Sequence, residues 1–299
     1  MFDFLAALLA GGALVAIGYF VIMPALRSLV AAQARREDAA EIDSEWFTIL
    51  HDRVPASRGL SEPERVRLLK LARALVATRR WEGAGGLVLS IEMKVVIASQ
   101  ASILTLTTRS EPYPGLREIL VYPAGFIAKR ARDPRKWLET SDPEEPTPEL
   151  GEAWGNGVIV LGWEGSLEGA NDPTDGSNLV IHEFAHQFAH DHHLIPPSIG
   201  EASITMRTAG FGVTTEILPV VPDVDRWRRV LAASYARRCE RADGRSVLSD
   251  YATTNLAEFF AVATESFFER PAALEQEDGA LYEQLVMLYG RDPKVGAST

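Results

Sequence analysis

The chain has 299 residues, 46% of them hydrophobic, and a formal net charge of −11. This length allows a large hydrophobic core in one or two domains. No stretch combines clustered basic residues with aromatic ones, so we expect no nucleic-acid partner. Cys239 is the only cysteine, which excludes a disulfide within the chain and a cysteine-based metal site.

The first apolar run extends from Phe4 to Leu26 and contains no charged residue. As a helix it would be ~34 Å long, enough to cross a bilayer. A cleaved signal peptide is the alternative, but only Asp3 precedes the run and the usual basic region is missing. We therefore expect residues 1–30 to be a transmembrane anchor.

The orientation of this anchor follows from three arginines. Arg27, Arg35 and Arg36 come after the span, and no Lys or Arg precedes it. The positive-inside rule then predicts a single-pass protein of the inner (cytoplasmic) membrane with the rest of the chain in the cytoplasm.

The remaining elements are predicted in chain order. Residues 31–44 form a charged juxtamembrane linker, and a soluble domain occupies residues 45–295. Ser61 begins a helix that runs to about Arg79, and Trp81–Gly86 is a glycine-containing turn. Further elements are a core helix near Ile91–Leu104, strands at Ile119–Tyr122 and Gly157–Leu161, and an amphipathic helix at Val224–Arg241. Two loops are also predicted. Ala128–Pro148 is an exposed loop or a lid, and Leu194–Val221 frames a cleft.

The stretch Leu179–His193 reads LVIHEFAHQFAHDHH and contains an H-E-x-x-H motif at residues 182–186. On a helix, His182 and His186 lie one turn apart on one face, where both imidazoles can bind a single metal ion. Zinc favours nitrogen ligands, and Glu183 can act as general base for the attacking water. The turn residues Asn171–Asn178 precede this helix.

Three further histidines follow the motif. His190 is one more turn along, but ligands at i and i+8 of a straight helix are ~12 Å apart and cannot share an ion. We expect His190 to support the site or lie at the surface, and His192 and His193 to lie at the exposed helix end.

A second helical stretch begins at Asn255 and carries Glu258, Glu265 and Glu269 on one face. A carboxylate from it can complete a site of two histidines and one glutamate. Glu258 is also placed to cap its own helix together with Asn255. Helix chemistry alone leaves Glu258 and Glu265 as equal candidates for the third ligand.

The segments NLVIHEFAHQF (Asn178–Phe188) and DYATTNLAEFFAVATESFFERP (Asp250–Pro271) together resemble the Mlc titration factor A family of zinc metallopeptidases. Arg79–Leu87, Gly155–Trp163 and the final Tyr289 with Asp292-Pro293 fit the same pattern, so the resemblance covers Trp81 to Pro293. The chain departs from the family at Ala189, which replaces an acidic residue, in Leu194–Ser246, which is longer, and in the N-terminal anchor.

The resemblance implies one zinc ion per chain held by His182, His186 and Glu258, with Glu183 as catalytic base. Glu265 would orient a ligand histidine, and the phenol of Tyr251 would stabilise the oxyanion. Family members also bind a glucose-responsive transcriptional repressor, which makes a transcriptional regulator a possible partner.

We therefore expect an α+β, zincin-like metallopeptidase domain with a small sheet and active-site helices, preceded by one transmembrane helix. Its substrate would be a peptide or protein held in an extended form by a strand edge at Gly157, Val158, Ile159 and Val160. The alternative function is a non-catalytic, membrane-tethered scaffold that binds a transcriptional regulator.

Overall fold

The structure is a computed structural model in which residues 42–108, 113–123, 157–195, 223–241 and 245–295 are described. The chain divides into two compact units, Met1–Asp43 and Ser44–Thr299, and the description that follows concerns the second. Among the described residues, no helix has the length and apolar character needed to cross a bilayer. The expected span at Phe4–Leu26, the loop at Ala128–Pro148 and nearly all of Leu194–Val221 lie outside the described residues.

Three parallel strands form a sheet in the order β1-β2-β3. They are β1 (Arg80–Gly83), β2 (Glu118–Tyr122) and β3 (Val158–Gly162), and Ile119 of β2 lies opposite Trp81 and Ile159. The predicted strands at residues 119–122 and 157–161 are confirmed to within one residue. Side chains at alternate positions of β2 and β3 are fully buried, as expected for a sheet with one face in the core.

The prediction that Trp81–Gly86 is a turn is wrong for its first residues, because β1 extends to Gly83. The sequence of this strand is RWEG, with a single apolar side chain, so no apolar alternation marks it. Pairing with β2 stabilises it instead, and the ladder continues beyond its end with a bond from Ala84 N to Val121 O at 2.8 Å. The turn itself follows at residues 84–87, where Gly85 and Gly86 have positive φ angles.

The N-terminal helices are α2 (Ser44–Arg53), a short 3₁₀ turn (Pro55–Gly59), α3 (Glu62–Thr78) and α4 (Ile91–Ile103). Ser61 begins α3 as predicted, and its amide and hydroxyl both donate to the Glu64 carboxylate. Helix α4 has nine consecutive buried residues, from Val95 to Ile103, which confirms the prediction of a core helix.

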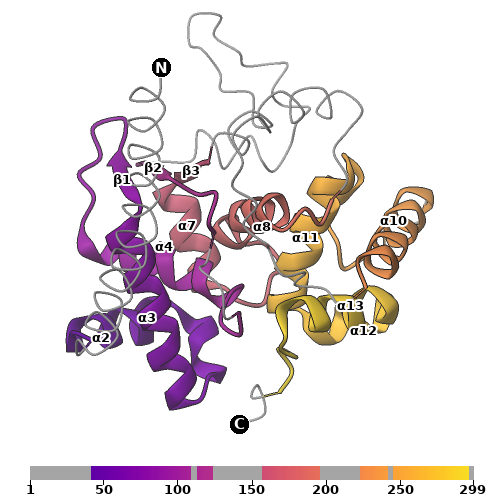
Figure 1. The fold of residues 1–299 in the computed structure, drawn as a ribbon, viewed down its shortest axis with the longest axis horizontal. Helices are drawn as coiled ribbons and strands as arrows, with labels where there is room; N and C mark the ends of the chain where they lie inside the picture. Colours follow the sequence, from indigo (N-terminus) through magenta and orange to yellow (C-terminus); the bar gives the residue numbers. More distant parts are fainter. Residues whose placement is uncertain (1–41, 109–112, 124–156, 196–222, 242–244, 296–299) are drawn as a thin grey trace, which may run out of the picture. The chain divides into compact units, whose positions relative to one another are not determined.

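The site helices follow the sheet. They are α7 (Trp163–Asn171), α8 (Leu179–Asp191), α10 (Val224–Glu240), a 3₁₀ turn called η3 (Asp250–Thr253), α11 (Leu256–Glu269), α12 (Pro271–Glu277) and α13 (Gly279–Tyr289). Helices α8 and α11 lie side by side, with α4 and the sheet on one side of them and α10, α12 and α13 on the other (Figure 1). Helices and a small parallel sheet confirm the α+β class.

Aromatic side chains pack α8 against α11 and α13. The ring of Tyr289 lies 5.5 Å from Phe188 and 5.6 Å from Phe267, centroid to centroid, and Tyr113 meets Phe184 edge to face at 4.9 Å. Each buried aromatic side chain of this kind contributes ~1.5–3 kcal/mol by leaving water. This packing fixes the two helices that carry the predicted site.

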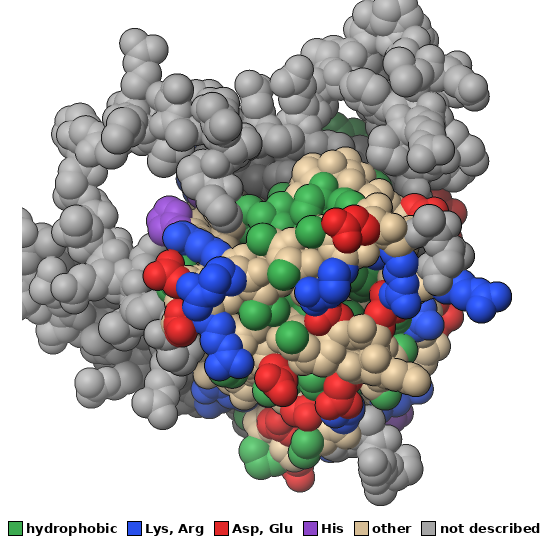
Figure 2. Space-filling model, turned by 90° about the vertical axis from the view of Figure 1, so that its right-hand side faces the viewer, with side chains coloured by type: hydrophobic (Ala, Val, Ile, Leu, Met, Phe, Trp, Pro, Cys, Tyr) green, Lys and Arg blue, Asp and Glu red, His purple; other side chains and the backbone are tan. Residues whose placement is uncertain are grey.

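Charged side chains of both signs are interspersed on the face drawn in Figure 2, with apolar side chains between them. Some of the charged side chains form ion pairs between neighbouring elements: Arg237 of α10 lies 2.7 Å from Asp278, and Arg241 lies 2.7 Å from Glu277. Exposed pairs contribute only ~0–1 kcal/mol each. Apolar packing therefore supplies most of the stability of this region.

Candidate metal centre

The first two candidate ligands come from α8. Asn178 begins this helix by accepting a hydrogen bond from Ile181 N at 3.0 Å, which confirms that the Asn171–Asn178 segment precedes the helix. The four-residue spacing places His182 and His186 on the same face, and both side chains are buried. Their Nε2 atoms are 3.1 Å apart.

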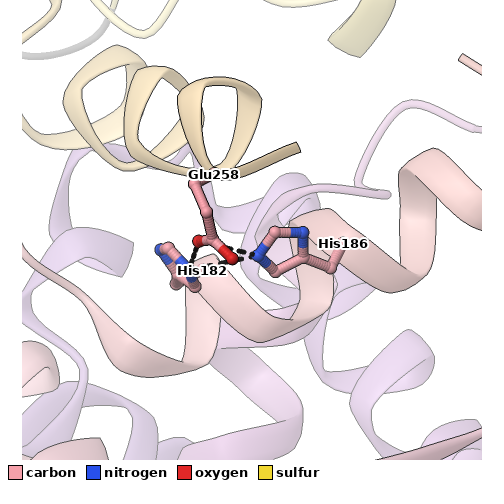
Figure 3. Close-up of side chains that lie close together, drawn as sticks. All are labelled: His182, His186 and Glu258. Atoms are coloured by element: carbon pink, nitrogen blue, oxygen red, sulfur yellow. Dashed lines mark hydrogen bonds and ion pairs between the residues drawn. The ribbon is translucent and has the colours of Figure 1, made fainter. Parts of the chain in front are cut away.

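The third candidate ligand comes from α11. Asn255 begins this helix, and its side chain accepts from the amides of Ala257 and Glu258 at 2.9 Å. The carboxylate of Glu258 is directed towards the two imidazoles of α8 rather than back to its own cap (Figure 3). Only the Asn255 half of the predicted capping box is therefore present, because the Glu258 amide donates to Asn255 while the Glu258 carboxylate faces the histidines.

The donor atoms form a nearly equilateral triangle. Glu258 Oε2 lies 2.9 Å from His182 Nε2 and 3.3 Å from His186 Nε2, and the histidine nitrogens are 3.1 Å apart. Ligands bound tetrahedrally to zinc are ~3.3 Å from one another, given metal–ligand distances of about 2.0–2.1 Å. The triangle fits this arrangement with adjustments of a few tenths of an ångström. Among the described residues, these three are also the group whose ligand atoms converge, all within 4.8 Å.

The electrostatics of the cluster favour a cation. Burial would lower the pKa of His182, but the carboxylates of Glu265 and Glu258 outweigh this effect and raise the pKa well above its usual value. Burial would raise the pKa of Glu258, yet its bonds to both histidines lower it strongly. The field that stabilises a proton here also stabilises a metal ion, so protons and metal compete for the site.

Comparison with known proteins shows which family the chain belongs to. The sequence model of the family described as glucose-regulated metallo-peptidase M90 matches residues 29–193 and 214–290, which is most of the chain. The chain belongs to this family. The family name points to a metallopeptidase, and both candidate ligand helices lie within the matched residues.

Relatives of the chain match most of its length. An uncharacterised protein of Synechocystis is 32% identical over 253 residues, which are 84% of this chain and 85% of that protein. Mlc titration factor A of Yersinia pestis and that of Yersinia pseudotuberculosis are each 29% identical over 260 residues, covering 85% of this chain and 87% of theirs. The expected resemblance to the Mlc titration factor A family is thus confirmed.

Glu265 lies on the opposite side of His182 from the other candidate ligands. Its Oε1 lies 2.7 Å from His182 Nδ1, and its Oε2 accepts from the amide of Asn178 at 2.5 Å. Helix chemistry had left Glu258 and Glu265 as equal candidates. In this M90 chain the packing of α11 on α8 directs Glu258 to the Nε2 atoms and Glu265 to the other ring nitrogen.

Glu183 and Tyr251 are the two residues expected to act on the substrate. Glu183 is buried on α8. Tyr251 lies on η3, and its ring centroid is 5.8 Å from that of His182. Burial raises the pKa of the Tyr251 phenol, and the charges of Glu258 and Glu183 raise it further, so the phenol remains a hydrogen-bond donor. Both side chains thus belong to the same cluster as the candidate ligands.

The other predicted residues lie further from this cluster. His190 and His193 are exposed, as expected. The prediction for His192 is wrong, because its ring is half-buried and packs on Phe188 with centroids 4.4 Å apart. Helix α8 ends at Asp191, and the turn that follows places the His192 ring against Phe188.

The strand expected to bind substrate is β3. Gly157 precedes it with a φ of +68°, and its carbonyl accepts from the amides of Arg117 and Glu118 at 2.8 and 3.1 Å. Main-chain groups alternate between the two sides of a strand, so Val158 and Val160 direct theirs away from β2. No described strand lies on that side. Ile159 is fully buried and contributes to the core instead.

Sequence reasoning missed the polar network behind Glu265. Gln100 of α4 and Glu269 of α11 both bond to the Asn178 side chain. A signal for the first was present: Gln100 interrupts the apolar run of a core helix. Nothing in the local sequence indicated that it would meet Asn178, which is 78 residues away.

Proposed function

We propose that this M90 protein is a zinc-dependent peptidase, anchored in the inner membrane by residues 1–30 with residues 45–295 in the cytoplasm. One observation carries the enzymatic part: the ring nitrogens of His182 and His186 converge on the Glu258 carboxylate. The ligand atoms come from two helices, and 76 residues separate His182 from Glu258. Mixed nitrogen and carboxylate donors suit zinc, although affinity order alone does not exclude other divalent metals.

The reaction follows from the residues around this cluster. A zinc ion held there supplies Lewis-acid chemistry, polarising the scissile carbonyl and making water a better nucleophile. Glu183 accepts the proton of the attacking water and delivers it to the leaving amine. The Tyr251 phenol donates a hydrogen bond to the oxyanion that develops on the carbonyl. Glu265 holds the His182 ring by its Nδ1 atom.

The substrate is a peptide segment in an extended form. The main-chain groups of Val158 and Val160 on β3 are free of β2, and they can pair with an incoming strand. This mode of binding recognises the backbone and accepts varied side chains. It agrees with a peptidase that selects extended, accessible segments.

The membrane part of the proposal rests on the apolar run at Phe4–Leu26 and the arginines that follow it. Protease digestion of sealed vesicles tests it. The C-terminal domain should be degraded in inverted vesicles and protected in right-side-out ones. The reverse pattern would contradict the proposed orientation.

A second candidate function is a non-catalytic scaffold that binds a transcriptional regulator at the membrane. It is favoured by the name of the relatives, Mlc titration factor A. The substitution Glu183→Gln distinguishes the two functions, because a scaffold needs no general base.

The test uses the detergent-solubilised full chain and a fluorogenic peptide library. A peptidase should cleave members of the library, lose this activity with a chelator, recover it with zinc, and lack it as Glu183→Gln. Cleavage that is indifferent to both the chelator and Glu183→Gln would overturn the proposed enzyme.

A further inference from the structure

A buried polar network lies behind the candidate metal centre, on the side of His182 away from Glu258. Its centre is Asn178, the first residue of α8, whose side chain is almost wholly buried. Gln100 of α4, the Gly169 carbonyl of α7, and Glu265 and Glu269 of α11 surround it. Four helices therefore meet at one amide side chain.

Asn178 is held by bonds at each of its polar atoms. Its Nδ2, which carries two hydrogens, lies within hydrogen-bond distance of three acceptors: Gln100 Oε1 and Gly169 O, each at 3.0 Å, and Glu269 Oε1 at 3.1 Å. Its Oδ1 accepts from Ile181 N, and its backbone amide donates to Glu265 Oε2 at 2.5 Å. Gln100 is in turn fixed, since its Nε2 donates to Val96 O and Ser166 O. The direction of the Asn178 amide is consequently set by side chains of α4 and α11 and by a backbone carbonyl of α7.

Glu269 completes this arrangement from the last turn of α11. Its Oε1 accepts from Asn178, and its Oε2 accepts from the amide of Gly176 at 3.1 Å. Gly176 has a φ of +79°, a backbone conformation that favours glycine, and the bond from its amide joins this turn to Glu269. Glu269 thus joins the end of α11 to both the turn before α8 and the first residue of α8.

The charged groups around Glu269 are acidic. In the described part of the chain, the charged groups that act on Glu269 are Glu265 and Asp175, both acidic, and no Lys or Arg forms an ion pair with it. Burial, assisted by these two carboxylates, raises the pKa of Glu269 to about 8. Glu269 is then mostly uncharged at neutral pH, and the carboxylates in contact with His182 are those of Glu265 and Glu258.

We propose that Glu269 is a positioning residue for the metal centre: with Asn178 it fixes the carboxylate of Glu265, which in turn fixes the ring of His182. The proposal rests on the proposed metal site and adds to it Asn178 and Glu269, which lie behind Glu265. A histidine ligand needs its second ring nitrogen held in order to present the first one in a defined direction. Here the holding carboxylate bonds His182 with one oxygen and the Asn178 amide with the other.

The first test compares zinc affinities of the full chain by competition with a chelating dye. Glu269→Ala should lower the affinity about tenfold, the lower end of the range for partners of metal ligands. Glu277→Ala is the matched control. Glu277 also accepts from a backbone amide and a hydroxyl, those of Val247 and Ser246, but has no bond to the network. Its loss should change zinc affinity less than about twofold.

Two further variants distinguish the position of the Glu269 side chain from its acidity. They also keep the test decisive if Glu269→Ala fails to fold. Glu269→Asp keeps the acid but withdraws it from Asn178, so zinc affinity should fall as in Glu269→Ala. Glu269→Gln keeps the length and one carbonyl oxygen that can still accept from Asn178, and it gives up only the bond from the Gly176 amide, so its affinity should stay within about threefold of wild type. A wild-type affinity in Glu269→Asp with a loss in Glu269→Gln would overturn the proposal.

A second readout needs no metal. In the metal-free protein labelled with ¹⁵N-histidine, the Nδ1–H of His182 should be protected from exchange in wild type and in Glu277→Ala, and should exchange faster in Glu269→Ala or Glu269→Asp. Unchanged exchange and unchanged zinc affinity in these variants would overturn the positioning role. If wild type bound no zinc, the proposed function would fail, and the exchange of this proton would still decide whether Glu269 positions His182.

Discussion

Substitution of Asn178 by alanine should destabilise the protein far more than the loss of an ordinary helix cap. The structure gives two contributions to this cost. The first is the cap itself, since Asn178 Oδ1 accepts from Ile181 N, and such a cap contributes about 1 kcal/mol. The second is the buried network, in which Gln100 Oε1 and Glu269 Oε1 would lose the donor that Asn178 provides.

A buried acceptor left without a partner costs about 1–3 kcal/mol. Two of them and the cap together give roughly 3–5 kcal/mol for Asn178→Ala, allowing for partial relaxation. This is a large part of the ~5–15 kcal/mol by which a folded protein is stable. For a domain of this size, it corresponds to a fall in Tm of about 10 °C.

Ser90→Ala is the matched control. Ser90 begins α4 and accepts from Met93 N at 3.2 Å, but it is exposed and has no buried partner. Its loss should cost about 1 kcal/mol and lower Tm by roughly 3 °C. Both variants are compared with wild type by thermal and urea unfolding in the presence of a chelator, because bound metal adds its own stability. Equal losses in Asn178→Ala and Ser90→Ala would refute the role assigned to the network.

Three other predictions concern pH, catalysis and substrate binding. Burial raises the pKa of Glu269 to about 8, so between about pH 5 and pH 8 the unfolded chain binds fewer protons than the folded one. The free energy of unfolding of the metal-free wild type should therefore fall as the pH rises, by up to ~1.4 kcal/mol per pH unit. This slope should be shallower in Glu269→Gln, which has no titrating group at that position. Identical slopes would contradict this. Glu183→Gln should lower kcat about 10²–10⁴-fold while zinc content stays at the wild-type value, and full activity would exclude Glu183 as the base. Val160→Pro should raise KM several-fold with little change in Tm, because its amide faces the open edge of β3, whereas Ile159→Pro should prevent folding; an unchanged KM would exclude binding at this edge.

Much of α8 and α11 was predictable because their signals are local. Asn178 and Asn255 mark the helix starts, and the spacing of His182 and His186 places both rings on one face. Helix α4 was equally predictable, because its sequence is rich in Val, Ile and Ala. In each case the residues within one or two turns determine the outcome.

Features that depend on distant partners were not predictable. Strand β1 has a charged, four-residue sequence and exists through its pairing with β2. The sequence left Glu258 and Glu265 as equal candidates for the third ligand, and the packing of α11 on α8 gives them different neighbours. The resemblance to a known family, rather than helix chemistry, favoured Glu258 before the structure did.

The metal content of the purified full chain tests the central claim most directly, with wild type measured beside Glu258→Ala and Glu265→Ala at saturating zinc. About one zinc ion per chain is expected in wild type from the single cluster of two histidines and one carboxylate found in the described residues. Glu258→Ala should abolish this stoichiometry, and Glu265→Ala, which removes a partner of His182 rather than a ligand, should retain it. Wild-type protein without stoichiometric metal, or zinc that survives Glu258→Ala and is lost with Glu265→Ala, would contradict the metal centre described here.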